Sequence, residues 1–292
     1  MRVTTTTDEE VSLEMQKSVP SDTSRSLPPE TKPKRSRATL IAGQRILLLA
    51  PPIIVAVVLL VSWYISTATG SVPSFILPAP RDVFTALSDG LQSGLFLSNA
   101  LVTIQESLRG CLRAVVLALP LGYGLAKSRL FAAAVQPYLA AGQAIPAIVI
   151  APVLVLWLGY GLVPITVLCM LVVLFPMVIT TALGVQTIDR TLIDAARVEG
   201  ASGWSMLAYI EFPLALPAIL AAIRTGLTLS ITGALVGEFV SNSGQGLGAL
   251  VFLAKDQFNA PLLFATLIIL AGLASLYYGS SWLLVKLAKA IY

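Results

Sequence analysis

Three ionisable residues lie within an apolar part of the sequence, where charged side chains are rare. Glu106, Arg109 and Arg113 are spaced three and four residues apart, so on a helix they fall in one row. Ionisable groups at membrane depth are costly and usually contact protein or a water-filled cavity. The row therefore has two interpretations. It is either a Glu–Arg pair at the membrane edge, with the arginines reaching outwards, or part of the lining of a transport pathway.

Two more charges stand in or beside a later apolar segment. Arg224 lies about three turns into the stretch from Phe212 to Gly237, where we expect it to contact a neighbouring helix rather than a substrate. Glu238 follows this stretch and is either part of an external gate or an interfacial acid. The candidate pathway residues are accordingly Glu106, Arg109 and Glu238.

Most enzymatic chemistry is excluded by residues that the sequence lacks. It contains no histidine, which removes Ser-His-Asp and Cys-His nucleophiles and all His-ligated metal sites. Cys111 and Cys169 stand alone in apolar segments, so we interpret both as small buried hydrophobic residues. No glycine is followed by lysine, so the P-loop that binds ATP phosphates is missing. We therefore expect no catalytic residue, no cofactor and no metal.

A glycine-rich run, Gly244-x-Gly246-x-Gly248, has the spacing of some nucleotide-binding loops. Such loops connect a strand to a helix, whereas this run follows a predicted membrane helix. We interpret it as a turn or a re-entrant segment near the external mouth.

A second unusual segment runs from Asp194 to Pro213. Its first residues favour a short helix in which Ala195 and Ala196 allow another surface to approach closely. Gly200 is a plausible helix stop, because glycine adopts positive φ without steric cost. Ser202 can cap a following helix, and the prolines at 213 and 217 start or bend the next span. From spacing alone, an ordinary connecting loop fits equally well.

The elements that position these residues are membrane helices. The chain is 56% hydrophobic and 12% charged, with a mean hydropathy of +0.85, and soluble domains carry about 25% charged residues. Residues 130–188 contain no charge and must cross the membrane twice, with a turn near 159–164. The remaining predicted spans are residues 46–65, a helix beginning near 102 and ending near 126, residues 212–237 and residues 257–285.

Segments rich in basic residues alternate with segments that have few of them along the predicted spans, so the basic residues gather on one side of the membrane and orient the chain. The side rich in lysine and arginine is assigned to the cytoplasm, and its basic residues are Lys32, Lys34, Arg35, Arg37, Arg45, Lys127, Arg129, Arg190, Arg197, Lys286 and Lys289. The prediction is an all-α membrane protein with about six transmembrane helices and both termini in the cytoplasm. Residues 1–40 form a disordered cytoplasmic tail, and residues 41–292 form the transmembrane domain. The net charge of +4 comes from these flanking residues and does not indicate nucleic-acid binding.

The segment from Asp194 to Pro213 resembles the "EAA" signature of importer permeases of ATP-binding-cassette transporters, E-A-A-x3-G-x9-I-x-L-P. Asp194 stands in place of the glutamate and Phe212 in place of the leucine, and the other positions match in register: Ala195, Ala196, Gly200, Ile210 and Pro213. The resemblance implies that the loop at about 190–213 docks into a groove on an ATPase and transmits its closure. The ATPase-coupling residues that it implies are Asp194, Ala195, Ala196, Glu199, Gly200 and Ala201.

Within that family, residues 73–285 resemble sulfonate-, taurine- and nitrate-type permeases, for example in the run from Phe75 to Pro80. The resemblance implies a multi-pass subunit of the bacterial inner membrane that pairs with a second permease copy. It also implies two cytoplasmic ATPase subunits and an extracytoplasmic solute-binding protein as partners. Glu106 stands where such permeases commonly have arginine, so the substrate stays open between a sulfonate-, taurine- or nitrate-like anion and a heteroaromatic vitamin precursor.

A different class of protein, a secondary transporter or channel working alone, would also fit a six-span bundle with charges in its second span. Dependence on a separate ATPase discriminates between the two.

Overall fold

The computed structural model describes residues 37–241 and 244–291, and within these ranges every regular element is helical. The tail predicted to be disordered lies almost entirely outside the described residues. The elements are α2 (Arg37–Ala68), α3 (Pro80–Gln92), α4 (Leu95–Lys127), α5 (Arg129–Ala144), α6 (Ala147–Leu158), α7 (Leu162–Gln186), α8 (Arg190–Val198), α9 (Gly203–Met206), the π-helical turn η1 (Leu207–Glu211), α10 (Phe212–Ser241), α11 (Leu247–Asp256) and α12 (Ala260–Ile291).

The chain divides into two compact units, Met1–Val58 and Leu59–Tyr292. The described part of the first unit is the beginning of helix α2. The second unit contains the end of α2 and every other helix, and it holds all the residues discussed below.

Four helical stretches of the described chain are long and apolar enough to cross a membrane: α4, α7, the run 203–241 that ends in α10, and 260–280 of α12. Helices α5 and α6 add a fifth crossing if taken together, although they are bent by 100° at their junction. A shorter apolar stretch, Ile53–Ala68, belongs to α2. The all-helical membrane class is thus confirmed, while the count of six and the orientation of the termini stay predictions.

The charge-free stretch at 130–188 breaks where the glycines predicted a turn, because α6 ends at Leu158 and α7 begins at Leu162. The first half of the stretch was expected to be a single span, but it consists of the bent pair α5 and α6. The break follows from Pro146, which disfavours helical geometry at the preceding residue; Ile145 is extended, with φ −80° and ψ 121°. The second predicted span also begins earlier than expected, at Leu95, so α4 is about 50 Å long.

Helix α7 is the centre of the second unit, with α4 and α10 packed along it. Small side chains make up much of this contact, including Ala114 and Ala118 of α4 and Ala222 of α10. Small residues let membrane helices approach closely, which increases van der Waals contact. Cys111 and Cys169 are free and buried in this region, which confirms their interpretation as small core residues.

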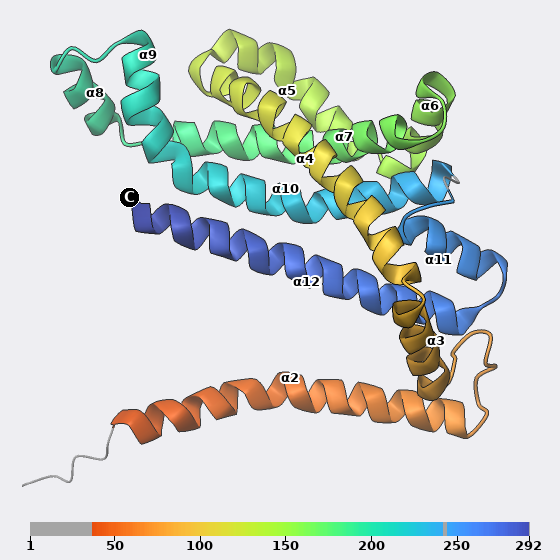
Figure 1. Ribbon diagram of the computed structural model, residues 1–292. Coiled ribbons are helices and arrows are strands. Elements are labelled where there is room, and N and C mark those ends of the chain that lie inside the picture. Colours follow the sequence, from red (N-terminus) through yellow and green to blue (C-terminus); the bar gives the residue numbers. More distant parts are fainter. Residues whose placement is uncertain (1–36, 242–243, 292) are drawn as a thin grey trace, which may run out of the picture. The chain divides into compact units, whose positions relative to one another are not determined.

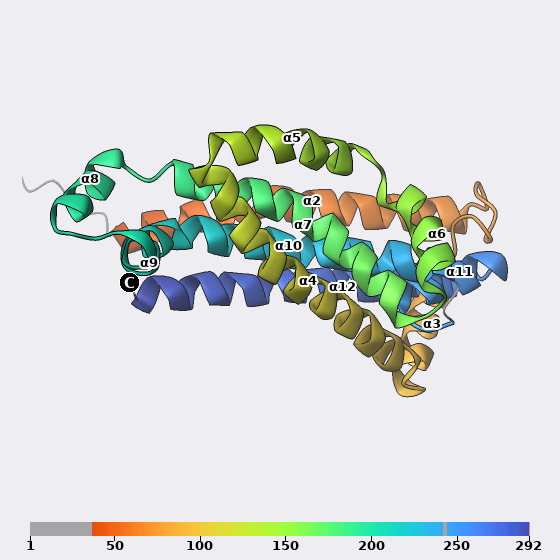
Figure 2. The same cartoon turned by 90° about the horizontal axis from the view of Figure 1, so that it is seen from above.

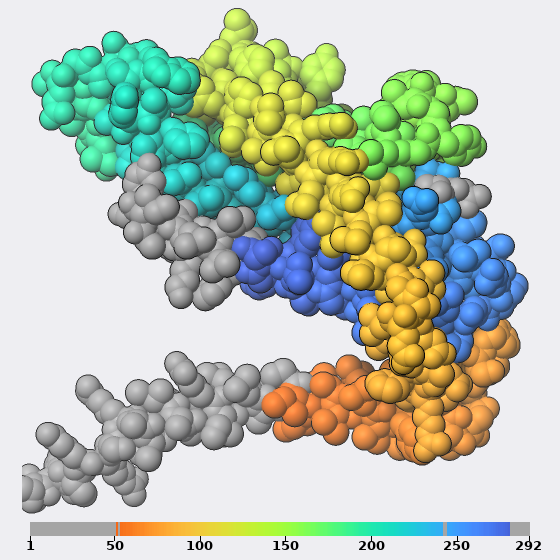
Figure 3. Space-filling view, in the orientation of Figure 1, coloured from red at the N-terminus to blue at the C-terminus, as the bar shows by residue number. Residues whose placement is uncertain are grey.

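The two ends of the second unit differ in structure. Helices α8 and α9 lie beyond one end of α7 and α10, and α6 and α11 lie at the other (Figures 1 and 2). In the space-filling view, α8 and α9 form a lobe at the end of α10 (Figure 3). We call these the α8 end and the α11 end; the distribution of basic residues predicts that the α8 end faces the cytoplasm.

Candidate functional site

The candidate coupling loop is a short helix closed by a glycine with positive φ. Helix α8 begins after Asp189, whose Oδ1 accepts a hydrogen bond of 2.9 Å from the backbone N–H of Thr191. This hydrogen bond holds the pKa of Asp189 below its ordinary value. Gly200 has a φ of +93°, its N–H donates to the Arg197 carbonyl at 3.0 Å, and the next N–H donates to the Ala196 carbonyl at 2.9 Å. This pair of hydrogen bonds is a Schellman motif, so the helix stop predicted at Gly200 is confirmed.

Ser202 then starts the next helix, as predicted. It is the N-cap of α9, and its backbone N–H donates to Ser205 Oγ at 3.0 Å. The two caps leave only residues 199–202 between α8 and α9. The loop therefore has a defined backbone geometry rather than that of a flexible connection.

The side chains of this loop face two directions. Asp194, Ala195, Glu199 and Gly200 are exposed, Ala201 is partly buried and Ala196 is buried. Contrary to the sequence-based expectation, only one of the two alanines can meet another surface, because the other packs against the chain itself. Asp194 forms an exposed ion pair with Arg197 at 3.0 Å, which contributes little to stability.

The two most exposed of the large apolar side chains of the loop were not singled out from the sequence. Val198 is 89% exposed and Trp204 is 78% exposed. Both lie beyond the α8 end of the long helices, in a segment rich in polar residues. Side chains exposed in this way are available for apolar contact with a partner. The sequence signal that could have identified them is their position, because each is an apolar residue at a helix end beside a polar loop.

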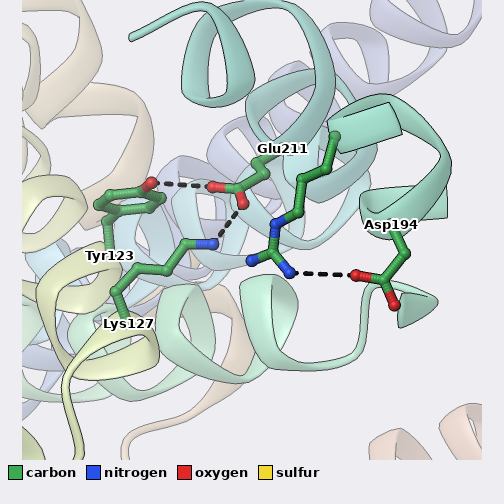
Figure 4. A network of polar contacts seen from close by, with 5 residues as sticks. Tyr123, Lys127, Asp194 and Glu211 are labelled. Carbon is green, nitrogen blue, oxygen red and sulfur yellow. Dashed lines mark hydrogen bonds and ion pairs between the residues drawn. The ribbon is translucent and has the colours of Figure 1, made fainter. Parts of the chain in front are cut away.

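A buried acid connects the loop to α4 (Figure 4). Glu211, which is 1% exposed, accepts a 2.8 Å hydrogen bond from the Tyr123 hydroxyl and forms an ion pair with Lys127. Tyr123 and Lys127 are four residues apart on α4, so they share a face. Glu211 is the only charged residue between positions 200 and 223. Sequence reasoning missed it because it occupies an unspecified position of the loop motif.

The backbone around Glu211 is a π-helical turn, in which the N–H of Phe212 donates to the carbonyl of Leu207. Pro213 follows immediately. A proline has no N–H and crowds the carbonyl four residues earlier, so a wider turn at this point relieves that crowding. Such π-helical turns occur frequently at functional sites.

The predicted row on α4 divides in two. Glu106 is buried, whereas Arg109 and Arg113 are exposed. Among the described residues no ion pair joins Glu106 to either arginine, so the expected Glu–Arg pair does not form. Gln105 is exposed as well, and with Arg109 and Arg113 it forms an outward polar row at intervals of four residues.

Beside this polar row, α4 exposes an apolar row that contains Leu101, Leu108 and Leu112. The surface of α4 inside the membrane thus has a polar strip and an apolar strip. Helix α10 also exposes polar side chains, namely Thr225, Thr228 and Thr232.

Arg224 makes the interhelical contact that was predicted for it. Its guanidinium lies 4.2 Å from the ring centroid of Tyr278 on α12. A cation above an aromatic face is attracted by the ring quadrupole. The partner is an aromatic ring rather than an acid.

Glu238 is fully buried, at 0% exposed, and it holds the glycine-rich run in place. Its Oε1 accepts from the Thr103 hydroxyl at 2.7 Å, and its Oε2 accepts from the N–H of Gly248 at 2.6 Å. A side chain at Gly246 would collide with this carboxylate. The run is therefore a tight turn into α11, as expected, and Glu238 is a positioning residue for that turn. Glu106 is buried beside it.

Comparison with known proteins places this arrangement in a family. Residues 115–290 match the family model described as "Binding-protein-dependent transport system inner membrane component". The riboflavin transport system permease protein of Chloroflexus aurantiacus is 40% identical over 229 residues, which cover 78% of this chain and 85% of the relative. The formylaminopyrimidine transport permease protein of Halalkalibacterium halodurans is 29% identical, over 78% of this chain and 90% of the relative.

Solved structures agree on the fold. An inward-facing structure of the MetNI methionine ABC transporter matches with a TM-score of 0.61 and 20% identity, over 66% of this chain and 96% of that chain. At this identity the similarity concerns the fold alone. The chain belongs to the inner membrane component family of binding-protein-dependent transport systems, and it is a multi-pass permease subunit of a bacterial ABC importer, in which a separate subunit hydrolyses ATP.

Proposed function

We propose that two copies of this permease form a pathway for a small planar heteroaromatic solute, with an ATPase docked on each coupling loop. The observation that carries the proposal is the exposed polar row on the membrane-spanning helix α4. The solute would be delivered by an extracytoplasmic binding protein, as the family implies.

The energetic cost of arginine in lipid supports a pathway position for this row. Placing one arginine at the centre of a membrane helix costs about 2.5–3.5 kcal/mol on the insertion scale. Arg109 and Arg113 lie near the middle of α4 and are exposed in the single chain. A water-filled pathway, or the interface with a second copy, would remove that cost, and the neighbouring leucine row would then face lipid.

The chemistry of the row favours an acceptor-rich solute. A guanidinium offers five N–H donors in a planar fork and stacks on aromatic rings. Carbonyl and ring-nitrogen acceptors of a flavin or a pyrimidine suit this group, as does an anion such as a sulfonate. We commit to the heteroaromatic class because the 40% identical relative is named for riboflavin and another for formylaminopyrimidine. The relative named for aliphatic sulfonates, from Bacillus subtilis, is 27% identical.

The coupling step would use the exposed side of the loop. Val198 and Trp204 offer apolar contacts, and tryptophan is among the residues that contribute most to protein interfaces. The Glu211 contacts with Tyr123 and Lys127 would then transmit a displacement of the loop to α4. The same helix carries Arg113 about 15 Å from Tyr123, at a rise of 1.5 Å per residue.

Uptake into liposomes tests the proposal. The permease, its ATPase and its binding protein are reconstituted, and labelled riboflavin, a formylaminopyrimidine and an alkyl sulfonate are supplied separately. We expect ATP-dependent uptake of a heteroaromatic compound, reduced about tenfold or more by Arg109→Gln with Arg113→Gln, which is what losing a charge-assisted hydrogen bond implies. Arg81→Gln, a change at an exposed arginine of α3, should leave uptake unchanged.

Two results would contradict the proposal in different ways. Uptake of sulfonate alone would reject the heteroaromatic class but retain the pathway. Unchanged uptake by the double glutamine variant would remove the polar row from the pathway.

A further inference from the structure

A cavity at the α8 end of the chain carries more positive than negative charge. It has a volume of about 650 Å³ and lies between the end of α4, the start of α5, the end of α7 and helix α8. Its charged lining residues are Lys127, Arg129, Arg190, Arg197, Asp194 and Glu211. Two of the four cations are neutralised within the chain, because Lys127 pairs with Glu211 and Arg197 pairs with Asp194 (Figure 4).

The other two cations, Arg129 and Arg190, form no ion pair within the described residues. Each is the first residue of a helix, α5 and α8 respectively, where the helix dipole also favours an anion. The cavity therefore retains two positive charges that no acid among the described residues pairs with. An arginine fork binds a phosphate group through two parallel hydrogen bonds.

Apart from Gln186, the uncharged lining is apolar and connects the cavity to the membrane helices. It consists of Leu125, Ala126, Ala132, Val185, Ile188 and Ile193, and Leu130, next to Arg129, is 83% exposed. A free phosphate ion would gain nothing from such a wall, whereas a phospholipid would place its headgroup between the arginines and its chains along the apolar residues.

We propose that this cavity binds the headgroup of an anionic phospholipid of the cytoplasmic leaflet, with Arg129 and Arg190 contacting the phosphate. Basic pockets between membrane helices on the cytoplasmic side suit such headgroups. The two ion pairs that line the cavity belong to the coupling loop and its contact with α4. A bound lipid would therefore stabilise the contact between the coupling loop and α4. This site does not depend on the identity of the transported solute.

Lipid binding to the full chain in neutral detergent, counted by native mass spectrometry, tests the site. Phosphatidylglycerol is titrated against phosphatidylcholine, and inorganic phosphate is added in a separate arm. One basic residue near the headgroups contributes about a fivefold change in affinity. Arg129→Gln should thus weaken phosphatidylglycerol binding about fivefold, and Arg129→Gln with Arg190→Gln about 25-fold.

Two sets of variants separate charge from folding. Arg129→Lys with Arg190→Lys keeps the charge and should retain most of the phosphatidylglycerol binding, and Arg81→Gln should bind as the unmodified chain does. The proposal is overturned if the double glutamine variant binds phosphatidylglycerol unchanged, or if phosphatidylcholine binds as tightly. Displacement of the lipid by equimolar inorganic phosphate would make the cavity a free-anion site and would overturn it as well.

Discussion

Replacing Gly200 tests whether the geometry of the coupling loop matters for binding the ATPase. The residue has a φ of +93°, and no atom lies within 4 Å of a Cβ placed there. A substitution therefore acts through the backbone conformation and not through a collision. Alanine at positive φ costs about 1–2 kcal/mol, a β-branched valine costs more, and asparagine is tolerated best.

The cost falls on the loop because the hydrogen bond that closes it depends on that conformation. If residue 200 moves to negative φ, the N–H of residue 201 loses the carbonyl of Ala196 on α8. A penalty of about 1–2 kcal/mol lowers the population of the docking conformation about 5- to 30-fold. The apparent affinity for the ATPase should fall by that factor. The order of affinity should be Gly200, then Asn, then Ala, then Val.

The assay is titration of the ATPase onto permease in liposomes, with ATP hydrolysis and solute uptake as further readouts. Gly94 provides the matched control. It also has positive φ, +74°, and open space around its missing side chain, but it precedes α4 at the end away from α8. Gly94→Val should strain the backbone equally and leave ATPase affinity unchanged. The reasoning is refuted if Gly200→Val binds the ATPase normally, or if Gly94→Val weakens binding as much.

Three further outcomes are expected. Lys127→Met leaves the buried Glu211 carboxylate without its cation and should cost about 1–2 kcal/mol of stability, less than breaking a fully buried pair because the lysine is partly exposed. ATPase-coupled uptake should fall as well. Glu211→Gln keeps an acceptor for the tyrosine hydroxyl, so its effect on stability and on uptake should be milder. Glu238→Ala removes the acceptor for two buried donors and should lower the free energy of unfolding by about 2–4 kcal/mol in denaturant titrations, and an unchanged value would exclude a positioning role. Ala195→Cys should react with a membrane-impermeant thiol reagent only from the cytoplasmic side and Tyr160→Cys only from outside; the reverse pattern would invert the orientation.

Parts of this structure that depend on local chain chemistry could be predicted from the sequence. The turn before α7, the helix stop at Gly200 and the cap at Ser202 follow from residues whose backbone preferences act over a few positions. The long charge-free stretch predicts two crossings from the thickness of the hydrocarbon core; one of them is the long apolar helix α7, and the other, the bent pair α5 and α6, stays a prediction.

Features that depend on which way a helix faces could not be predicted. Helix α7 is apolar on all sides, because lipid and protein interior accept the same side chains, so its pattern does not show where its neighbours lie. The spacing of Glu106 and Arg109 correctly made them neighbours on α4. Only the packing of α7 and α10 determines that the first is buried and the second exposed. Ala196 was misjudged in the same way, since its burial depends on how α8 packs and not on the residues next to it in sequence.

Helix α4 joins the two proposed functional regions, the polar row and the coupling loop, because it carries the first and contacts the second. Near its middle it exposes Arg109 and Arg113, and at its end Tyr123 and Lys127 contact Glu211 of the loop segment. A pathway lined by the first pair would thus be attached to the ATPase through the second pair, with no other element needed between them. Pro120 lies between the two pairs and removes one backbone hydrogen bond from the helix. Motion of the loop can therefore turn the end of α4 more easily than a continuous helix would allow. Only the fraction of that motion that is transmitted past Pro120 would displace the polar row.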